Sequence, residues 1–84
     1  MAKQIASGET GTTAKEKVGG FNTLLIFLEF VTPGDVDIEA TPDGGTTWLK
    51  YGNIDESGIS TLSKSPEELR LVANNGAEFN AWVE

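Results

Sequence analysis

Three acidic residues in alternate positions are the first group in this 84-residue chain that could do chemistry. Asp35, Asp37 and Glu39 would lie on one face of a strand, at intervals of roughly 6 to 7 Å. This interval is too wide for the three carboxylates to share one Ca²⁺ ion without oxygen ligands from a loop. We therefore interpret them as a solvated acidic face, which also discourages edge-to-edge aggregation.

The composition offers few other groups for catalysis or metal binding. The chain contains no His and no Cys, so it lacks the commonest general base, the usual imidazole ligand and any thiolate or disulfide. Ser and Thr are plentiful, but no His is present to activate their hydroxyl groups. We expect no catalytic residue, no metal site and no cofactor, and a protein that is not an enzyme.

The net charge of the chain limits the classes of partner that it is expected to bind. It is −7, from 13 acidic and 6 basic residues, and the basic residues are scattered along the chain. Nucleic acid and anionic membranes require clustered Lys and Arg, so neither is expected. The N-terminus lacks the apolar core of a signal peptide, and the apolar run Leu24–Leu28 is too short to span a membrane. These features predict a protein made in the cytosol.

The stretch from Asp35 to Trp48 predicts a β-hairpin. Its first half alternates acidic with apolar residues, which is typical of a strand with one face on a core. Pro42-Asp43-Gly44-Gly45 then supplies the residues of a tight turn. Thr46-Thr47-Trp48 would begin the returning strand, and the Trp48 side chain is large enough to cap one end of a small core.

The strongest strand signal runs from Phe21 to Val31. Alternate residues from Leu24 onward lie on one face, and Leu25 and Phe27 lie on the other. Apolar residues on both faces indicate a strand that is covered on both sides. This second face must meet another layer, the N-terminal segment or another subunit.

Two turn signals and the spacing of the strands predict the fold. Thr32-Pro33-Gly34-Asp35 has Pro and Gly at the central positions of a type II turn, and Asn74-Asn75-Gly76 is typical of a tight hairpin turn. We expect each to join its two flanking strands as a hairpin. The chain then contains six to eight short strands and no long helix. This pattern predicts an all-β fold, a small antiparallel β-sandwich or barrel.

Residues 1–20 differ in character from residues 21–84, which we expect to form the β-sandwich domain. Ile5 and Val18 are the only large apolar residues between Lys3 and Gly20, and short strands are possible at Lys3–Ala6 and Thr12–Val18. The segment could supply edge strands to its own domain and end in a loose terminus. It could instead be an arm that adds to the sheet of a neighbouring subunit.

The last strand places Trp82 on the face opposite Phe79, Ala81 and Val83. If Trp82 clusters with Leu25 and Phe27, the three form an apolar patch that a monomer should not expose. Either a second sheet or the N-terminal segment covers this patch, or it is a subunit contact. With the two apolar residues of the N-terminal segment, the candidate contacts with another subunit are Ile5, Val18, Leu25, Phe27 and Trp82.

The turn motif resembles the Asp-box hairpin of sialidases and related propellers. The match includes Thr41, Asp43, Gly45, Thr47 and Trp48, but it covers eight residues and occurs once. In those enzymes the motif is a structural turn away from the catalytic centre. The resemblance implies that Asp43 bonds the loop backbone and that Trp48 packs beneath it, and it does not indicate glycosidase activity.

A broader resemblance covers roughly Val18 to Glu84. The Leu/Ile-rich strand after Gly19-Gly20-Phe21, the run from Gly34 to Trp48, Leu69-Arg70-Leu71, and Asn75-Gly76 with its closing aromatic strand look like small all-β virion proteins of tailed bacteriophages.

This resemblance implies a decoration or cement protein on the capsid surface of the virion, assembled as a dimer or trimer. It would bind the major capsid protein and stabilise the joints between capsid subunits. Two alternatives remain. One is a carbohydrate-binding or adhesion module of a phage fibre, in which Trp48, Tyr51 or Trp82 forms a stacking platform. The other is a tail or connector component.

Overall fold

The computed structural model describes residues 2–19 and 23–84, and these residues form eight β-strands and no helix. No helix that could span a membrane occurs in these two ranges. Gly20, Phe21 and Asn22, which include the predicted start of the strongest strand, lie outside the described residues. The strands are β1 (Lys3–Glu9), β2 (Glu16–Lys17), β3 (Leu24–Thr32), β4 (Asp35–Ala40), β5 (Leu49–Ile54), β6 (Gly58–Leu62), β7 (Glu68–Asn74) and β8 (Glu78–Val83).

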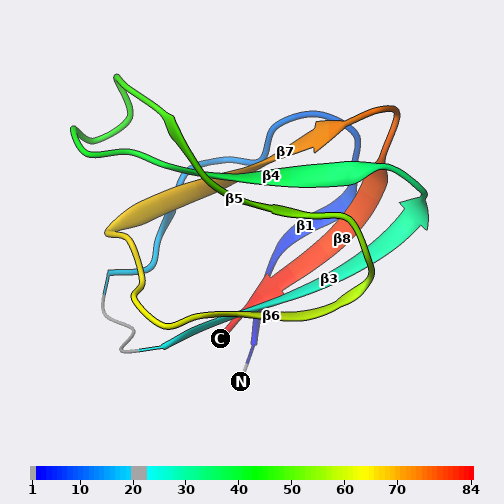
Figure 1. Ribbon diagram of the computed structural model, residues 1–84, viewed down its shortest axis with the longest axis horizontal. Helices are drawn as coiled ribbons and strands as arrows, with labels where there is room; N and C mark the ends of the chain where they lie inside the picture. Colours follow the sequence, from blue (N-terminus) through cyan, green and yellow to red (C-terminus); the bar gives the residue numbers. More distant parts are fainter. Residues whose placement is uncertain (1, 20–22) are drawn as a thin grey trace.

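The strands form two antiparallel sheets of four strands each. The first sheet has the order β1-β8-β3-β6 and the second has the order β2-β7-β4-β5. Figure 1 shows the two sheets as layers, with the second sheet above the first. The predicted all-β fold is confirmed, and of the two predicted forms it is the sandwich.

The connections between strands give the sandwich its topology. β4 and β5 are the only consecutive pair among the eight described strands that belongs to one sheet, and the other six connections pass from one sheet to the other. Eight antiparallel strands with this order form a jelly roll, a double sheet of two Greek-key motifs.

The hairpin predicted at Thr32–Asp35 is wrong. β3 pairs with β6 and β8, whereas β4 pairs with β5 and β7, so Pro33 and Gly34 carry the chain between the sheets. Gly34 is required here by close packing. A Cβ atom at this position would lie 2.6 Å from Ala77 Cβ and 2.7 Å from the Asn74 carbonyl oxygen.

The turn predicted at Asn74–Gly76 has the expected backbone conformation but a different role. Asn75 and Gly76 both have positive φ, 57° and 77°, and the Ala77 amide donates to the Asn74 carbonyl oxygen at 3.2 Å. The turn joins β7 of the second sheet to β8 of the first. The predicted hairpin is therefore wrong, because a tight turn fixes the local path and does not decide which strands pair.

The predicted β4–β5 hairpin exists, but its loop is longer than expected. Residues 41–48 lie outside the strands, and β5 begins only at Leu49. Thr46, Thr47 and Trp48 therefore do not start the returning strand. The backbone amides of Thr46 and Thr47 bond the Asp43 carboxylate instead of a neighbouring strand.

The N-terminal segment pairs with its own domain in both sheets. β1 pairs with β8 at the edge of the first sheet, and β2 pairs with β7 at the edge of the second. Between them, Thr13 donates its amide to the Leu71 carbonyl oxygen at 2.9 Å and forms part of the same edge. In the described residues this segment completes the sandwich.

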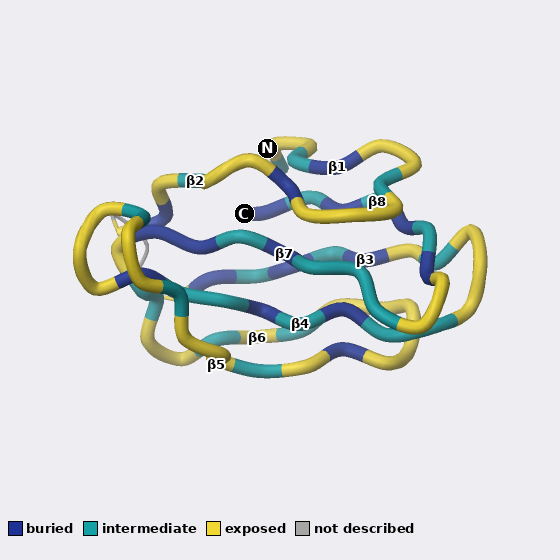
Figure 2. Tube along the Cα trace, turned by 90° about the horizontal axis from the view of Figure 1, so that it is seen from above, coloured by how far each residue is buried: buried dark blue, intermediate teal, exposed yellow. Residues whose placement is uncertain are grey.

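The core lies between the two sheets. Buried positions recur at every second residue along β8, and β3 and β4 show the same alternation (Figure 2). The side chains facing inward from both sheets form one cluster, whose members are Ala6, Val18, Leu24, Ile26, Leu28, Val36, Ile38, Ile54, Leu69, Leu71, Phe79, Ala81 and Val83.

Candidate interaction surface

An apolar row crosses the outer face of the first sheet. Phe27 of β3 lies opposite Trp82 of β8 on one side and opposite Ile59 of β6 on the other. Residues directly opposite each other on antiparallel strands project from the same face. The neighbouring residues Ile26 and Ala81 are fully buried, so the row points away from the core. We call Trp82, Phe27 and Ile59 the outer row.

The outer row becomes more exposed toward the open edge of the sheet. Trp82 and Phe27 are half-buried, and Ile59 is 63% exposed. Leu25 lies on the same face, two residues before Phe27 and opposite Thr61 of β6. No described strand lies over this outer face (Figure 1). The face is therefore open to a partner.

Polar groups border the row on one side. Asn80 donates its side-chain amide to Glu29 Oε1 at 3.0 Å, and its own Oδ1 accepts from the Gly8 amide at 2.7 Å. These bonds tie β1, β8 and β3 together along their outer faces. An apolar centre with a polar border is the usual anatomy of a protein–protein contact.

The structure separates the predicted contact residues into two groups. It brings Leu25, Phe27 and Trp82 together on the outer face. Val18 is only 1% exposed and belongs to the core, so its predicted role as a contact with a partner is wrong. Ile5 is half-buried and packs against the same core, which leaves little of it for a partner.

Ile59 was missed by the sequence interpretation. The residues before it, Asp55-Glu56-Ser57-Gly58, are typical of a loop, and they obscure the start of β6. Ile59 and Thr61 would lie on one face of a strand, and Ser60 and Leu62 on the other. This period of two is the signal that could have identified the strand.

The acidic residues of β4 are engaged on the outer face of the second sheet. Asp35 accepts hydrogen bonds from the side-chain amides of Asn53, at 2.7 Å, and Asn74, at 3.2 Å. Asp37 accepts from Asn53 at 2.8 Å and lies 3.4 Å from Lys50 Nζ. The amide of Asn53 is the main cause that lowers the pKa of both Asp35 and Asp37.

Glu39, the third acidic residue of β4, pairs with Arg70. Arg70 Nε lies 2.7 Å from Glu39 Oε1, on the neighbouring strand β7. No group of three or more His, Cys, Asp or Glu in residues 2–19 and 23–84 is placed to hold a metal ion. The acidic face therefore consists of carboxylates that bind amides and cations of this chain.

The loop between β4 and β5 is organised by one carboxylate. Asp43 Oδ1 accepts from the amides of Thr46, at 3.1 Å, and Thr47, at 2.8 Å, and from the Thr41 hydroxyl at 3.0 Å. The Thr47 bond is the main cause that lowers the pKa of Asp43 to about 2. This geometry matches the structural role that the Asp-box resemblance implies.

The indole of Trp48 packs against the loop and against β7. Its Nε1 donates to the Gly45 carbonyl oxygen at 3.0 Å, and the Arg70 guanidinium carbon lies 4.2 Å from its ring centroid. Trp48 is not part of the core cluster, so the prediction that it caps the core is wrong. Arg70 covers part of the ring instead.

The three aromatic residues proposed as a carbohydrate platform lie in different places. Trp48 is in the β4–β5 loop, Trp82 is on the outer face of the first sheet, and Tyr51 is on the edge strand β5, where its hydroxyl donates to the Lys64 carbonyl oxygen at 2.6 Å. A sugar-binding platform needs aromatic rings in one plane. The structure does not bring these residues together.

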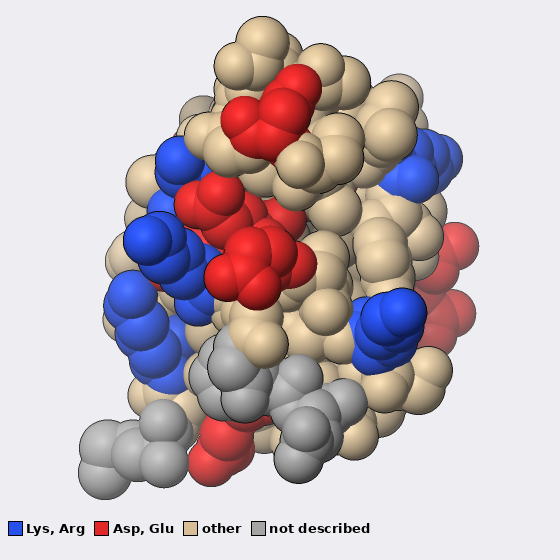
Figure 3. All heavy atoms as spheres, turned by 90° about the vertical axis from the view of Figure 1, so that its left-hand side faces the viewer, with Lys and Arg blue, Asp and Glu red and all other residues tan. Residues whose placement is uncertain are grey.

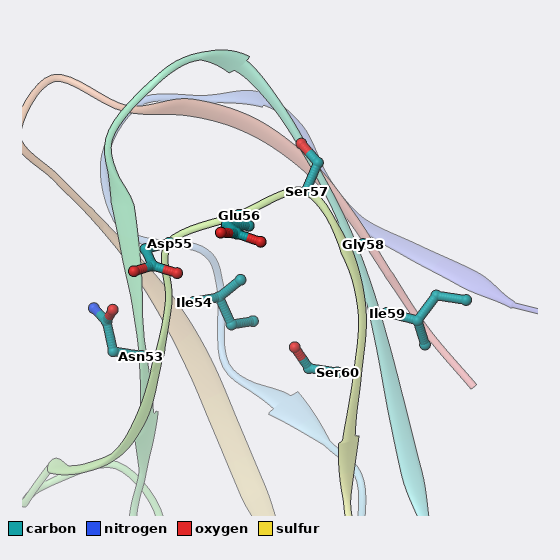
Figure 4. A pocket seen from close by; sticks show the side chains of 8 residues that line it. All are labelled: Asn53, Ile54, Asp55, Glu56, Ser57, Gly58, Ile59 and Ser60. Atoms are coloured by element: carbon teal, nitrogen blue, oxygen red, sulfur yellow. The ribbon is translucent and has the colours of Figure 1, made fainter.

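A shallow hollow lies at the connection between β5 and β6, lined by residues 53–60. Figure 4 shows Ile54 and Ser60 pointing into the space between the two strands and Ile59 pointing away from it. The ionisable groups that line the hollow are the carboxylates of Asp55 and Glu56. The hydroxyls of Ser57 and Ser60 also line it.

Charged side chains of both signs share the end of the sandwich that carries the β4–β5 loop. Lys and Arg gather along one margin of this end, and Asp and Glu lie beside them (Figure 3). The ion pairs Lys15–Glu68, at 3.3 Å, and Lys3–Glu16, at 2.9 Å, join such neighbours. The basic groups are thus largely matched by acidic groups of the same chain.

A scan of protein-family models finds no match to the chain, and comparisons with curated proteins and with solved structures find none either.

Proposed function

We propose that this protein is a structural virion protein, a capsid decoration protein that binds the outer surface of a bacteriophage head. It stabilises the contacts between major capsid subunits. The observation that carries the proposal is the outer row with Leu25, an apolar surface on a sheet that no described strand covers. Apolar side chains that stay partly open to solvent side by side on one face indicate a site of interaction.

The fold is compatible with this role but does not select it. Jelly rolls occur in viral capsid proteins, in lectins and in cupins. A fold hosts many functions, and function is set by the residues of a particular site. Here the surface is an apolar strip on the open face of a sheet, which suits contact with another protein better than enclosure of a small molecule.

The role also suits a small domain with little stability of its own. An 84-residue chain without a disulfide has a small core and is marginally stable alone. Binding to a shell stabilises the folded state by mass action. The acidic character of the chain would keep decorated particles soluble.

Between the alternatives, the structure favours a protein partner over a carbohydrate. Trp48 is partly covered by Arg70, and Tyr51 and Trp82 lie on other elements, so a stacking platform is not formed. A tail or connector component would use the same apolar surface. It differs from a decoration protein in the number of copies per particle.

The copy number is the direct test. Virus particles from the source of this sequence would be purified, and the chain would be quantified by mass spectrometry against the major capsid protein. We expect a simple ratio to the capsid protein, near one or a simple fraction such as a third. A handful of copies would assign the chain to the tail or connector, and its absence from particles would refute the virion role.

A pair of variants tests the docking surface. Trp82→Gln removes an aromatic side chain from the outer row, and Leu49→Gln removes a 60% exposed apolar side chain from β5 of the other sheet. We expect Trp82→Gln to lower the occupancy on heads at least tenfold, while Leu49→Gln leaves it unchanged. Equal occupancy of both variants, each confirmed as folded by circular dichroism, would refute docking through this face.

A further inference from the structure

The four edge strands of the sandwich differ in how they are protected against pairing with another chain. Natural edges carry bulges, charged residues or Pro, or are very short. β1 has two register shifts, between Gln4 and Ala6 and between Ala6 and Glu9. β2 has only two residues. β5 carries Lys50 and pairs with β4 through a register shift.

β6 has none of these devices. Its sequence, Gly58-Ile59-Ser60-Thr61-Leu62, contains no charged residue and no Pro. It pairs with β3 residue by residue, from Leu24 opposite Leu62 to Leu28 opposite Gly58, without a shift. β6 is thus a regular, uncharged edge, and its Ile59 side chain is 63% exposed.

We propose that two copies of this chain pair antiparallel through β6, so that the two first sheets become one continuous sheet of eight strands. The pairing is a two-fold symmetric contact in which the same surface of each copy is used. Strand addition of this kind satisfies the main-chain groups at an open edge. The proposal concerns the isolated protein and does not depend on the virion role.

Symmetry and side-chain direction fix the register. Ile59 and Thr61 project from the outer face, since they lie opposite Phe27 and Leu25. Opposite residues share a face, so outward residues of one copy must face outward residues of the other. Full overlap of the two β6 strands then places Ser60 opposite itself and Ile59 opposite Thr61 of the second copy.

Charge complementarity supports a second copy of this chain as the partner of β6. Glu56 and Lys64 lie in the bends on either side of β6. With Ser60 on the two-fold axis, Glu56 of one copy therefore falls at the same end of the contact as Lys64 of the second copy. Symmetry repeats this pair at the other end of the contact. Both side chains are exposed, and a chain with a net charge of −7 needs such local attraction to associate with itself.

The register also makes the apolar surface continuous. The outer row of one copy runs from Trp82 through Phe27 to Ile59. It then meets Thr61 and, beyond it, Leu25 of the second copy, because Leu25 lies opposite Thr61 within each chain. The dimer therefore carries two parallel rows across one broad face.

The mass in solution tests the assembly. We expect the purified protein to shift from 8.9 kDa toward twice this mass in sedimentation equilibrium. The shift should fall between about 1 µM and 1 mM, the range of a weak and small interface. A chain that stays monomeric over this range would overturn the proposal.

Charge reversal tests the register. Glu56→Lys and Lys64→Glu each place like charges at both ends of the contact, so each should raise the dimer dissociation constant about fivefold or more. The double variant restores the opposite charges and should recover the dissociation constant of the natural chain. Dimerisation that is insensitive to both single variants, or a double variant weaker than either, would overturn this register.

A thiol at the symmetry axis tests the contact directly, because the natural chain contains no Cys. Opposite residues of antiparallel strands have Cα atoms about 4.5 to 5.5 Å apart, which suits a disulfide. Ser60→Cys should form a covalent dimer under diamide far faster than the control Thr10→Cys, an exposed position outside the strands. Equal rates for the two variants would contradict the pairing.

Discussion

The Arg70 guanidinium carbon lies 4.2 Å from the centroid of the Trp48 ring, which ties the β4–β5 loop to strand β7. The same side chain reaches Glu39 of β4 with its Nε at 2.7 Å. One side chain thus links a loop and two strands on the outer face of the second sheet.

Removing this link should destabilise the protein. Arg70→Ala loses the cation–π contact and the ion pair with Glu39, so we expect a loss of about 1 to 2 kcal/mol in the free energy of unfolding. Arg70→Lys keeps the charge without the planar stacking surface and should lose about half as much. Urea unfolding measures the stability of both variants. In a Trp82→Phe background Trp48 is the remaining tryptophan, and its fluorescence emission should change only in a variant that loses the stacking. Equal stability of Arg70→Ala and the natural chain would contradict this role.

The Asp43 carboxyl should give the loop a dependence on acid pH. Its pKa is about 2 in the folded protein, below the ordinary value of 3.8. A carboxyl whose folded pKa is depressed favours the folded state above pH 3.8, and this contribution is lost as the pH falls from 3.8 through 2. We expect a carbon-detected NMR titration to place the midpoint of Asp43 near pH 2. A midpoint near 3.8 would show that the Thr46 and Thr47 bonds are absent in solution.

The variant Asp43→Asn is the matched control for this titration. Its amide oxygen can still accept from the Thr46 and Thr47 amides, but it has no charge to lose. Asp35 and Asp37 also have pKa values lowered from 3.8, so their contributions to folding are lost at pH values below 3.8 as well. Asp43→Asn should therefore reduce the acid dependence of unfolding without abolishing it.

Gly34 and Gly44 should respond differently to Ala. At Gly34 a Cβ atom would meet Ala77 and the Asn74 backbone at 2.6 to 2.7 Å, so Gly34→Ala forces the two crossing segments apart. We expect a loss of about 2 kcal/mol or more in the free energy of unfolding. Gly44 has open space around it and φ of +79°, so Gly44→Ala should cost only about 1 kcal/mol, from backbone conformation.

The order of these two losses is the informative result. Both would be measured by denaturant unfolding of the full chain. A smaller loss at Gly34 than at Gly44 would mean that the crossing between β3 and β4 is not packed against the turn between β7 and β8.

Substitutions at Val18 and Leu25 should distinguish a core residue from a surface residue. Val18→Ala removes two methyl groups from a side chain that is 1% exposed, and we expect a loss of about 2 kcal/mol in the free energy of unfolding. Leu25→Ser on the half-buried outer face should lose less stability and weaken docking to heads. Thermal unfolding and head binding would be compared for both. The reverse pattern would contradict the assignment of Val18 to the core.

Local patterns in the sequence determined the strands and several of their faces. The alternation of apolar residues placed Leu25, Phe27 and Trp82 on the side away from Ile26 and Ala81, and the structure confirms those faces. The same reasoning failed at Ile59, because the polar residues before it resemble a loop and the strand that follows is short. Val18 was misplaced because an isolated apolar residue in a polar segment carries no periodicity.

An all-β chain of short antiparallel strands can be predicted from the sequence, because side-chain alternation and turn residues act over a few neighbouring positions. The sequence also indicates the positive φ of Asn75 and Gly76. The three-dimensional arrangement is needed to see that the turns at Gly34 and Gly76 join different sheets and that Phe27 lies between Trp82 and Ile59. Strand pairing depends on contacts between residues far apart in the chain. Several pairings are equally consistent with the local sequence signals, and the burial of both inner faces in one core selects one of them.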